Sequence, residues 1–139
     1  MVYSYLDHTS DVYVHIVSNT LEELFEEAAI ATFEVMLNTS NVEVKEVIDV
    51  EIDGDDLEQL LYKWIDNLLL VFDSRSFALR YAKVEEIKNN GRYYLKGKLY
   101  GEEYDPNKHE HRVGVKAMTY SLMKIFKNDK WEAYFVLDI

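Results

Sequence analysis

The chain contains no cysteine, a single proline (Pro106) and only five glycines among its 139 residues. The absence of cysteine excludes disulfides, zinc–thiolate sites and thiol catalysis. Because proline and glycine are so few, little of the chain resembles a flexible linker. The length is also typical of one domain. We therefore expect a single domain over residues 1–139.

Basic residues are scarce as well. Fifteen lysines and arginines stand against 26 aspartates and glutamates, which gives a formal net charge of -11. A surface of this sign repels phosphate backbones, so direct binding of nucleic acid is not expected. The charge favours divalent cations and basic protein surfaces as partners, although an acidic surface also serves solubility alone.

Long apolar runs and common catalytic motifs are both missing. No apolar segment approaches the roughly 20 residues that span a bilayer, and the longest, residues 64–72, is interrupted by Asp66 and Asn67. The N-terminus lacks the basic stretch and apolar run of a signal peptide. The sequence also lacks a Walker-type phosphate loop, a GxGxxG turn, an HExxH helix and a GxSxG elbow. We expect a cytoplasmic protein without membrane contact.

Two segments have the pattern of amphipathic helices. Thr20 and Glu23 form a capping box at the start of the first, residues 20–37. A second helix is expected from about residue 55 to residue 72. In both, apolar residues recur three and four positions apart: Leu21, Leu24, Phe25, Ala28, Phe33 and Met36 in the first, and Leu57, Leu60, Leu61, Trp64, Ile65, Leu68 and Phe72 in the second.

The remaining sequence is mostly of the β type. Strands are expected at residues 11–19, 42–53, 77–88, 92–100, 113–126 and 131–137, with a polar loop over residues 102–112. Asn89-Asn90-Gly91 predicts the turn of a hairpin, because Asn-Gly supplies positive φ angles. The pattern predicts an α+β domain, with a mixed or antiparallel β-sheet core and two long amphipathic helices packed on it.

Three places carry residues that suit chemistry. Asp7-His8-Thr9-Ser10-Asp11 places two carboxylates four residues apart in a turn, where they could converge on a hard cation. Asp138-Ile139 ends a strand with an acidic side chain and a main-chain carboxylate. The segment 105–120 contains His109, Glu110 and Lys116. The residues alone leave ordinary structural roles open at all three places, because aspartate, threonine and serine are common in turns and lysine is common at sheet edges.

The first of these segments resembles the opening signature of the archease family, usually written DHTAD, with Ser10 in place of the commoner alanine. The resemblance continues in order through TLEELFEEAA, the following Phe-x-Val-Met, GDDLEQLLYKWIDNLL, GEEYDPNKHE, VKAMTY and the terminal Asp-Ile. It therefore covers almost the whole chain. The chain departs from many members at Ser121, where they have histidine, and at His111, where they have proline.

The resemblance implies a function and a set of site residues. Archeases are held to promote guanylylation of RtcB-type RNA ligases and their repeated turnover in tRNA splicing. The family binds a divalent metal, with calcium the expected ion and magnesium or manganese as alternatives. Carried over, the ligands are the side chains of Asp11 and Asp138 and a main-chain oxygen of Ile139. Further residues are expected in activation or partner contact: Lys116, Asp7, His8, His109 and Glu110.

Two other functions remain open at this point. The first is a chaperone-like partner of a tRNA-modifying enzyme, such as a methyltransferase, which has also been suggested for the family. The second is a stand-alone hydrolase that uses Asp7, Asp11 and a metal, but the sequence shows no evident base for it. We expect an accessory protein that activates an RNA ligase and catalyses no reaction itself.

Overall fold

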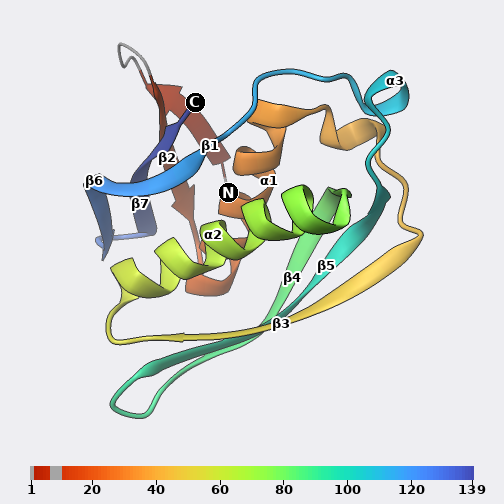
Figure 1. Ribbon diagram of the computed structural model, residues 1–139. Helices are drawn as coiled ribbons and strands as arrows, with labels where there is room; N and C mark the ends of the chain where they lie inside the picture. Colours follow the sequence, from red (N-terminus) through yellow and green to blue (C-terminus); the bar gives the residue numbers. More distant parts are fainter. Residues whose placement is uncertain (1, 7–10) are drawn as a thin grey trace.

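The structure, a computed structural model, describes residues 2–6 and 11–139. Figure 1 shows how their helices and strands are arranged. In chain order they are β1 (Val2–Leu6), β2 (Asp11–Ser18), α1 (Leu21–Met36), the 3-10 turn η1 (Thr39–Asn41), β3 (Glu46–Gly54), α2 (Leu57–Arg75), β4 (Phe77–Asn89), β5 (Tyr93–Glu103), α3 (Pro106–His109), β6 (Ala117–Lys127) and β7 (Trp131–Asp138).

The described strands form two antiparallel sheets. One has the order β1-β2-β7-β6 and the other the order β3-β5-β4. Every neighbouring pair is antiparallel. The predicted α+β class is therefore confirmed, with the expected sheet core divided into two sheets. The order of the first sheet places β2, near the N-terminus, beside β7, near the C-terminus.

Both long helices pack on the sheets. The α1 helix contacts β4 of one sheet and β2 and β7 of the other, while α2 contacts β6 and β3 (Figure 1). The large side chains of Phe25, Trp64 and Phe135 are fully buried in the shared core. The indole of Trp64 donates a 2.8 Å hydrogen bond to the carbonyl of Phe25, which joins the two helices and satisfies a buried polar group. Within the described residues, no helix is both long and apolar enough to cross a membrane.

The beginnings of both helices are set by local sequence. The Thr20 hydroxyl accepts a 3.1 Å hydrogen bond from the Glu23 amide, which confirms the predicted N-cap. The Asp56 carboxylate accepts a 2.7 Å bond from the Gln59 amide at the start of α2. Each cap satisfies a main-chain donor that the helix leaves unpaired, a contribution of about 1 kcal/mol. In the β4–β5 hairpin only Gly91 adopts the positive φ expected at the turn.

Two strands begin later than the sequence predicts, because their first residues make other hydrogen bonds. Residues 42–45 precede β3, where the amide of Glu43 donates to the Glu102 side chain. Residues 113–116 precede β6, and Val113 donates to the carbonyl of Val35 in α1. The expected loop over residues 102–112 also begins later and contains the short helix α3, with Asp105 at its N-cap and Pro106 in its first turn.

Candidate functional site

The sheet order brings the acidic residues of the two chain ends together. Asp11 is the first residue of β2 and Asp138 is the last residue of β7, and they are register partners in the antiparallel pair. Residues directly opposite in such a pair lie on the same face, with Cβ atoms about 5 Å apart. Two carboxylates separated by 127 positions along the chain are therefore neighbours in the fold (138 minus 11).

Lys116 lies on the other side of Asp138. Its amide donates a 2.7 Å hydrogen bond to the Asp138 carbonyl, and the next residue, Ala117, is the β6 partner of Asp138. The side chains of Lys116 and Asp138 are exposed, whereas Ile139 is half-buried and packs against the core. Packing of Ile139 holds the end of β7 in place. We call Asp11, Lys116, Asp138 and Ile139 the terminal corner.

The terminal corner has the oxygen donors that hard cations prefer. Carboxylates and main-chain oxygens are the usual ligands of calcium and magnesium, and calcium takes six to eight of them. Among the described residues, no group of three or more histidines, aspartates or glutamates could hold a metal ion. Asp7 and His8, which the sequence also singles out, lie outside the described residues. Metal binding by Asp11, Asp138 and Ile139 therefore stays a prediction.

A segment that crosses the end of α1 leads into this corner. Residues 110–116, here called the strap, join α3 to β6. The Arg112 amide donates to the Met36 carbonyl at 2.9 Å and the Val113 amide to that of Val35 at 3.2 Å. These bonds satisfy carbonyls that the last turn of α1 leaves unpaired. The strap is thereby tied to α1 immediately before Lys116.

Charged groups of the strap pair within the molecule. The Arg112 guanidinium lies 2.9 Å from the Glu34 carboxylate and donates at 2.6 Å to that of Glu110. Burial alone would raise the pKa of Glu34, but hydrogen bonds from Thr39 and Arg112 lower it below its ordinary value. Glu110 is exposed and has a positive φ of 63°. Its expected role in partner contact stays a prediction.

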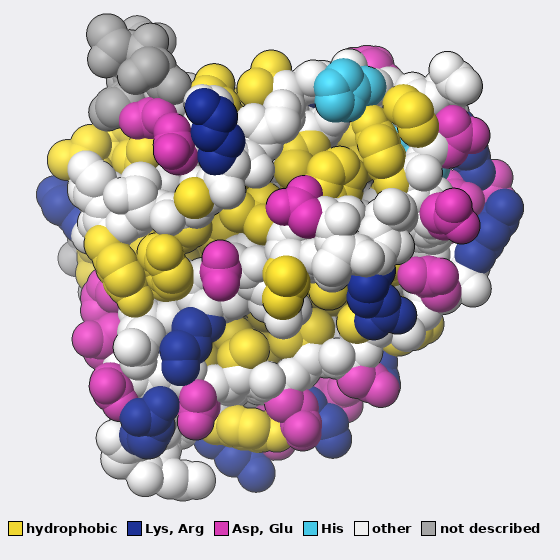
Figure 2. Space-filling view, viewed as in Figure 1, with side chains coloured by type: hydrophobic (Ala, Val, Ile, Leu, Met, Phe, Trp, Pro, Cys, Tyr) yellow, Lys and Arg dark blue, Asp and Glu magenta, His cyan; other side chains and the backbone are white. Residues whose placement is uncertain are grey.

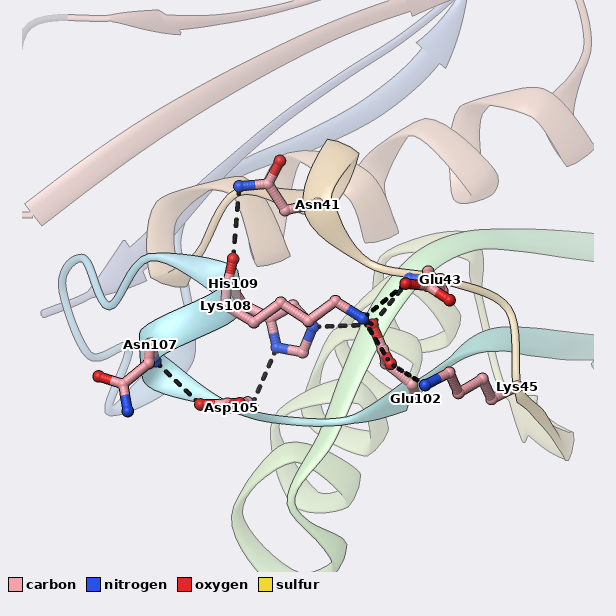
Figure 3. A network of polar contacts seen from close by, with 8 residues as sticks. All are labelled: Asn41, Glu43, Lys45, Glu102, Asp105, Asn107, Lys108 and His109. Atoms are coloured by element: carbon pink, nitrogen blue, oxygen red, sulfur yellow. Dashed lines mark hydrogen bonds and ion pairs between the residues drawn. The ribbon is translucent and has the colours of Figure 1, made fainter.

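His109, at the end of α3, is completely buried. Its Nδ1 accepts a 2.9 Å hydrogen bond from the Asp105 amide, so in the neutral ring the proton is on Nε2. Nε2 lies 2.9 Å from the Glu102 carboxylate and donates to it. Figure 3 shows the imidazole enclosed between these two partners. A role for this side chain in partner contact remains a prediction. Because the side chain is buried, its effect on a partner would be indirect, through the position of the strap.

Glu102 is the buried centre of this polar network. Its carboxylate accepts a 2.8 Å hydrogen bond from the Glu43 amide, lies 2.8 Å from Lys108 Nζ and 3.5 Å from Lys45 Nζ (Figure 3). Burial acts to raise the pKa of Glu102, but the bonds from Glu43, Lys108 and His109 outweigh it and lower this pKa to about 2. We call the group the anchor: Glu43, Lys45, Glu102, Lys108 and His109.

The anchor, apart from His109, and the strap bonds are the part of the site that sequence reasoning missed. Glu102 lies in the matched segment GEEYDPNKHE, where the resemblance implies no role for it, and Arg112 follows that segment without a motif of its own. The seven-residue separation of Glu102 and His109 matches no metal or catalytic spacing. Their pairing depends on the path of the chain through α3 and on the position of Glu43 in another segment. A sequence signal exists only for α3 itself, in Asp105-Pro106.

Comparison with known proteins shows similarity over the whole chain. The model of the Archease protein family (MTH1598/TM1083) matches residues 3–139. The chain is 48% identical to the protein archease of Sulfurisphaera tokodaii over 140 residues, covering 99% of this chain and 98% of the relative. It is 41% identical to the protein archease of Pyrococcus furiosus, with 99% and 98% covered, and 41% identical to that of Danio rerio, with 99% and 85% covered.

Solved structures of similar proteins have the same fold. The solution structure of Methanobacterium thermoautotrophicum protein 1598 has a TM-score of 0.84 and 36% sequence identity, covering 99% of this chain and 98% of the other. A crystal structure from Thermotoga maritima, described as an archease and possible chaperone, has a TM-score of 0.61 over 96% of this chain and 94% of the other. At 22% identity the second likeness concerns the fold alone.

Proposed function

The chain belongs to the archease family, and from this membership we propose that it activates an RtcB-type RNA ligase without catalysing a reaction itself. It would promote guanylylation of the ligase and its repeated turnover in tRNA splicing. The observation that carries this proposal furthest is the register pairing of Asp11 with Asp138. Two carboxylates placed opposite each other at the end of a sheet are positioned to share one cation.

In this proposal a divalent cation is bound at the terminal corner. Asp11 and Asp138 would hold it by their carboxylates and Ile139 by a main-chain oxygen, with calcium the expected ion and magnesium or manganese as alternatives. A bound cation would neutralise phosphate charge where the ligase reacts with GTP. Lys116, held against Asp138 through its main chain, would supply a second positive charge at the same place.

The charge of the chain supports a protein partner. With a formal net charge of -11, it suits the basic surface that an RNA enzyme must present to its substrate. We propose neither RNA nor membrane as a direct partner, and we propose the cytoplasm as the place of action.

A chaperone-like role for a tRNA-modifying enzyme, such as a methyltransferase, is the second candidate. It is favoured by the description of the Thermotoga maritima structure as a possible chaperone. Such a role would use the acidic surface and would need no metal. Affinity purification from cell extract separates the two, because the first predicts recovery of the ligase and the second recovery of the modifying enzyme.

The metal-dependent role is tested with Asp138→Ala. This variant should retain the fold, because Asp138 is exposed, and should lose activation of the matched ligase. Glu85→Ala is the control, since it removes one exposed carboxylate from β4 in the other sheet. Calcium titration by calorimetry should give heat with the wild type and with Glu85→Ala, and none with Asp138→Ala. Full activation by Asp138→Ala would exclude the terminal corner from the mechanism.

A further inference from the structure

The edge strand β6 contains a large bulge. In its ladder with β7, Thr119 pairs with Val136 and the next pair is Lys124 with Tyr134, so residues 120–123 lie opposite Phe135 alone. Within this bulge Leu122 has a φ of 60°, in the left-handed region that is costly for residues with a side chain. Leu122 as a whole residue is 50% exposed. The strained leucine therefore gains little burial in return.

The bulge continues into the exposed face of α2. Tyr120 is 52% exposed and stacks on Tyr62 of α2, with ring centroids 4.3 Å apart and an interplanar angle of 9°. Tyr62, Asp66 and Leu70 follow one another four residues apart, so they share one side of the helix. Leu70 is also 59% exposed. We call Tyr62, Leu70, Tyr120 and Leu122 the bulge–helix surface.

Acidic side chains accompany this apolar surface. Asp66 lies between Tyr62 and Leu70 on the helix and is exposed. Burial chiefly raises the pKa of Tyr120, and Tyr62 and the charge of Asp56 raise it further. The nearest lysine on α2, Lys63, is paired with Asp53 at 3.5 Å. Figure 2 shows apolar side chains interspersed with acidic and basic ones over this face of the molecule.

We propose that the bulge–helix surface docks a basic protein segment that carries an apolar side chain. Resting on the proposed function, we assign that segment to the RNA ligase. An apolar centre with acidic neighbours is complementary to an apolar side chain with basic neighbours. An RNA ligase presents basic surface because its substrate is a polyanion. Lys116 precedes Tyr120 by four residues along the chain, so a ligase bound here would also reach the terminal corner.

The outer face of the other sheet offers a contrast. There Tyr81 stacks on Tyr100 with centroids 4.7 Å apart, and Tyr81 is 41% exposed. The charges beside this pair are neutralised within the sheet, since Lys98 pairs with Asp49 and lies 3.9 Å from Glu85. This face combines exposed aromatic surface with balanced charge and no residue of positive φ. It provides the matched control.

The test measures affinity and activation separately. Leu122→Gly removes the exposed side chain and relieves the positive φ, so it should not weaken folding. Tyr120→Ala and Asp66→Lys remove the stacked ring and reverse one charge. Each should weaken binding of the ligase on the order of tenfold by calorimetry, while activation returns at saturating protein. Tyr81→Ala should bind as the wild type does. Asp138→Ala should bind with normal affinity and activate at no concentration.

Each contrary outcome has a distinct meaning. If the wild type activates the ligase, and Leu122→Gly and Asp66→Lys bind as tightly as Tyr81→Ala, the docking assignment is overturned and the proposed function stands. If the wild type binds the ligase through this surface but never increases turnover, the proposed function fails and the docking assignment stands. If Leu122→Gly weakens binding of a single-stranded RNA oligonucleotide instead, the surface belongs to RNA and the inference is wrong.

Discussion

The anchor and the terminal corner are two polar clusters joined by the strap, and their carboxylates have opposite surroundings. In the anchor, Glu102 is buried and faces Lys108, His109 and a main-chain amide. In the terminal corner, Asp138 is exposed and lies opposite another aspartate, Asp11. A buried carboxylate with donors on several sides holds its neighbours in one geometry, whereas two carboxylates placed opposite each other at a sheet end suit a ligand that brings positive charge.

From this difference we infer that the anchor and the terminal corner have separate roles. The anchor fixes α3 and the start of the strap, and the strap carries Lys116 to Asp138. Stability would then depend on the anchor, and binding on the terminal corner. Substitutions in the two clusters should accordingly have opposite effects on the free energy of unfolding.

The largest effect is expected for Glu102→Ala. It leaves the buried His109 without its acceptor and removes one of the two carboxylates that Lys108 contacts, so it should lower the free energy of unfolding by about 3 kcal/mol. Urea denaturation followed by circular dichroism measures this change. Glu103→Ala, which alters the exposed neighbouring residue, is the control and should change the value by less than about 0.5 kcal/mol. Equal effects from the two variants would show that the anchor stabilises nothing.

Acid should weaken the anchor in a defined range of pH. The pKa of Glu102 is lowered to about 2 in the fold, below its ordinary value, so the unfolded chain binds its proton first as pH falls. The stability due to Glu102 is therefore complete above about pH 4.5 and is lost as pH falls toward about 2. Glu102→Gln should flatten this part of the curve of unfolding free energy against pH. An unchanged curve would show that the Glu102 carboxylate does not stabilise the fold through these hydrogen bonds.

A smaller loss is expected when the strap is released. Arg112→Ala removes the hydrogen bonds to Glu34 and Glu110 and should lower the free energy of unfolding by about 1.5 kcal/mol. It should also reduce ligase activation, because Lys116 follows Arg112 in the strap. Lys83→Ala, an exposed change of the same charge in β4, should do neither. Wild-type activation by a destabilised Arg112→Ala would show that the strap does not position Lys116.

The smallest effect should have the opposite sign. With chelator present, Asp138→Asn should raise the free energy of unfolding by about 0.5 kcal/mol, because it removes one of two like charges that face each other. Calcium should raise the melting temperature of the wild type and leave that of the variant unchanged. A calcium-dependent rise in both proteins would place the cation elsewhere.

The sequence predicts local structure well where the cause is local. The helix starts follow from Thr20 and from the polar residues around Asp56, and the hairpin turn from Gly91, since each depends on neighbours within a few residues. The division of the strands between two sheets depends on pairing between distant segments. The starts predicted for β3 and β6 were too early for the same reason, because Glu43 and Val113 bond to residues far away in the sequence.

The candidate site divides in the same way. Family resemblance singled out Asp11, Lys116 and Asp138, and the sheet order then brought them together. Neither Glu102 nor the bulge at Leu122 could be found from the sequence. A buried acid is recognised only with its donors, and the positive φ of Leu122 results from the mismatch between β6 and β7. A leucine in a strand-like segment does not by itself indicate a positive φ or a bulge.

The most direct test of the account is RNA ligation by the matched RtcB-type ligase at limiting concentration, with GTP and manganese, in the presence and absence of this protein. The account predicts that product exceeds the amount of ligase many times only when the protein is present, and that Asp138→Ala abolishes this gain. Equal turnover with and without the folded wild-type protein would contradict the activator function and favour the role as partner of a tRNA-modifying enzyme.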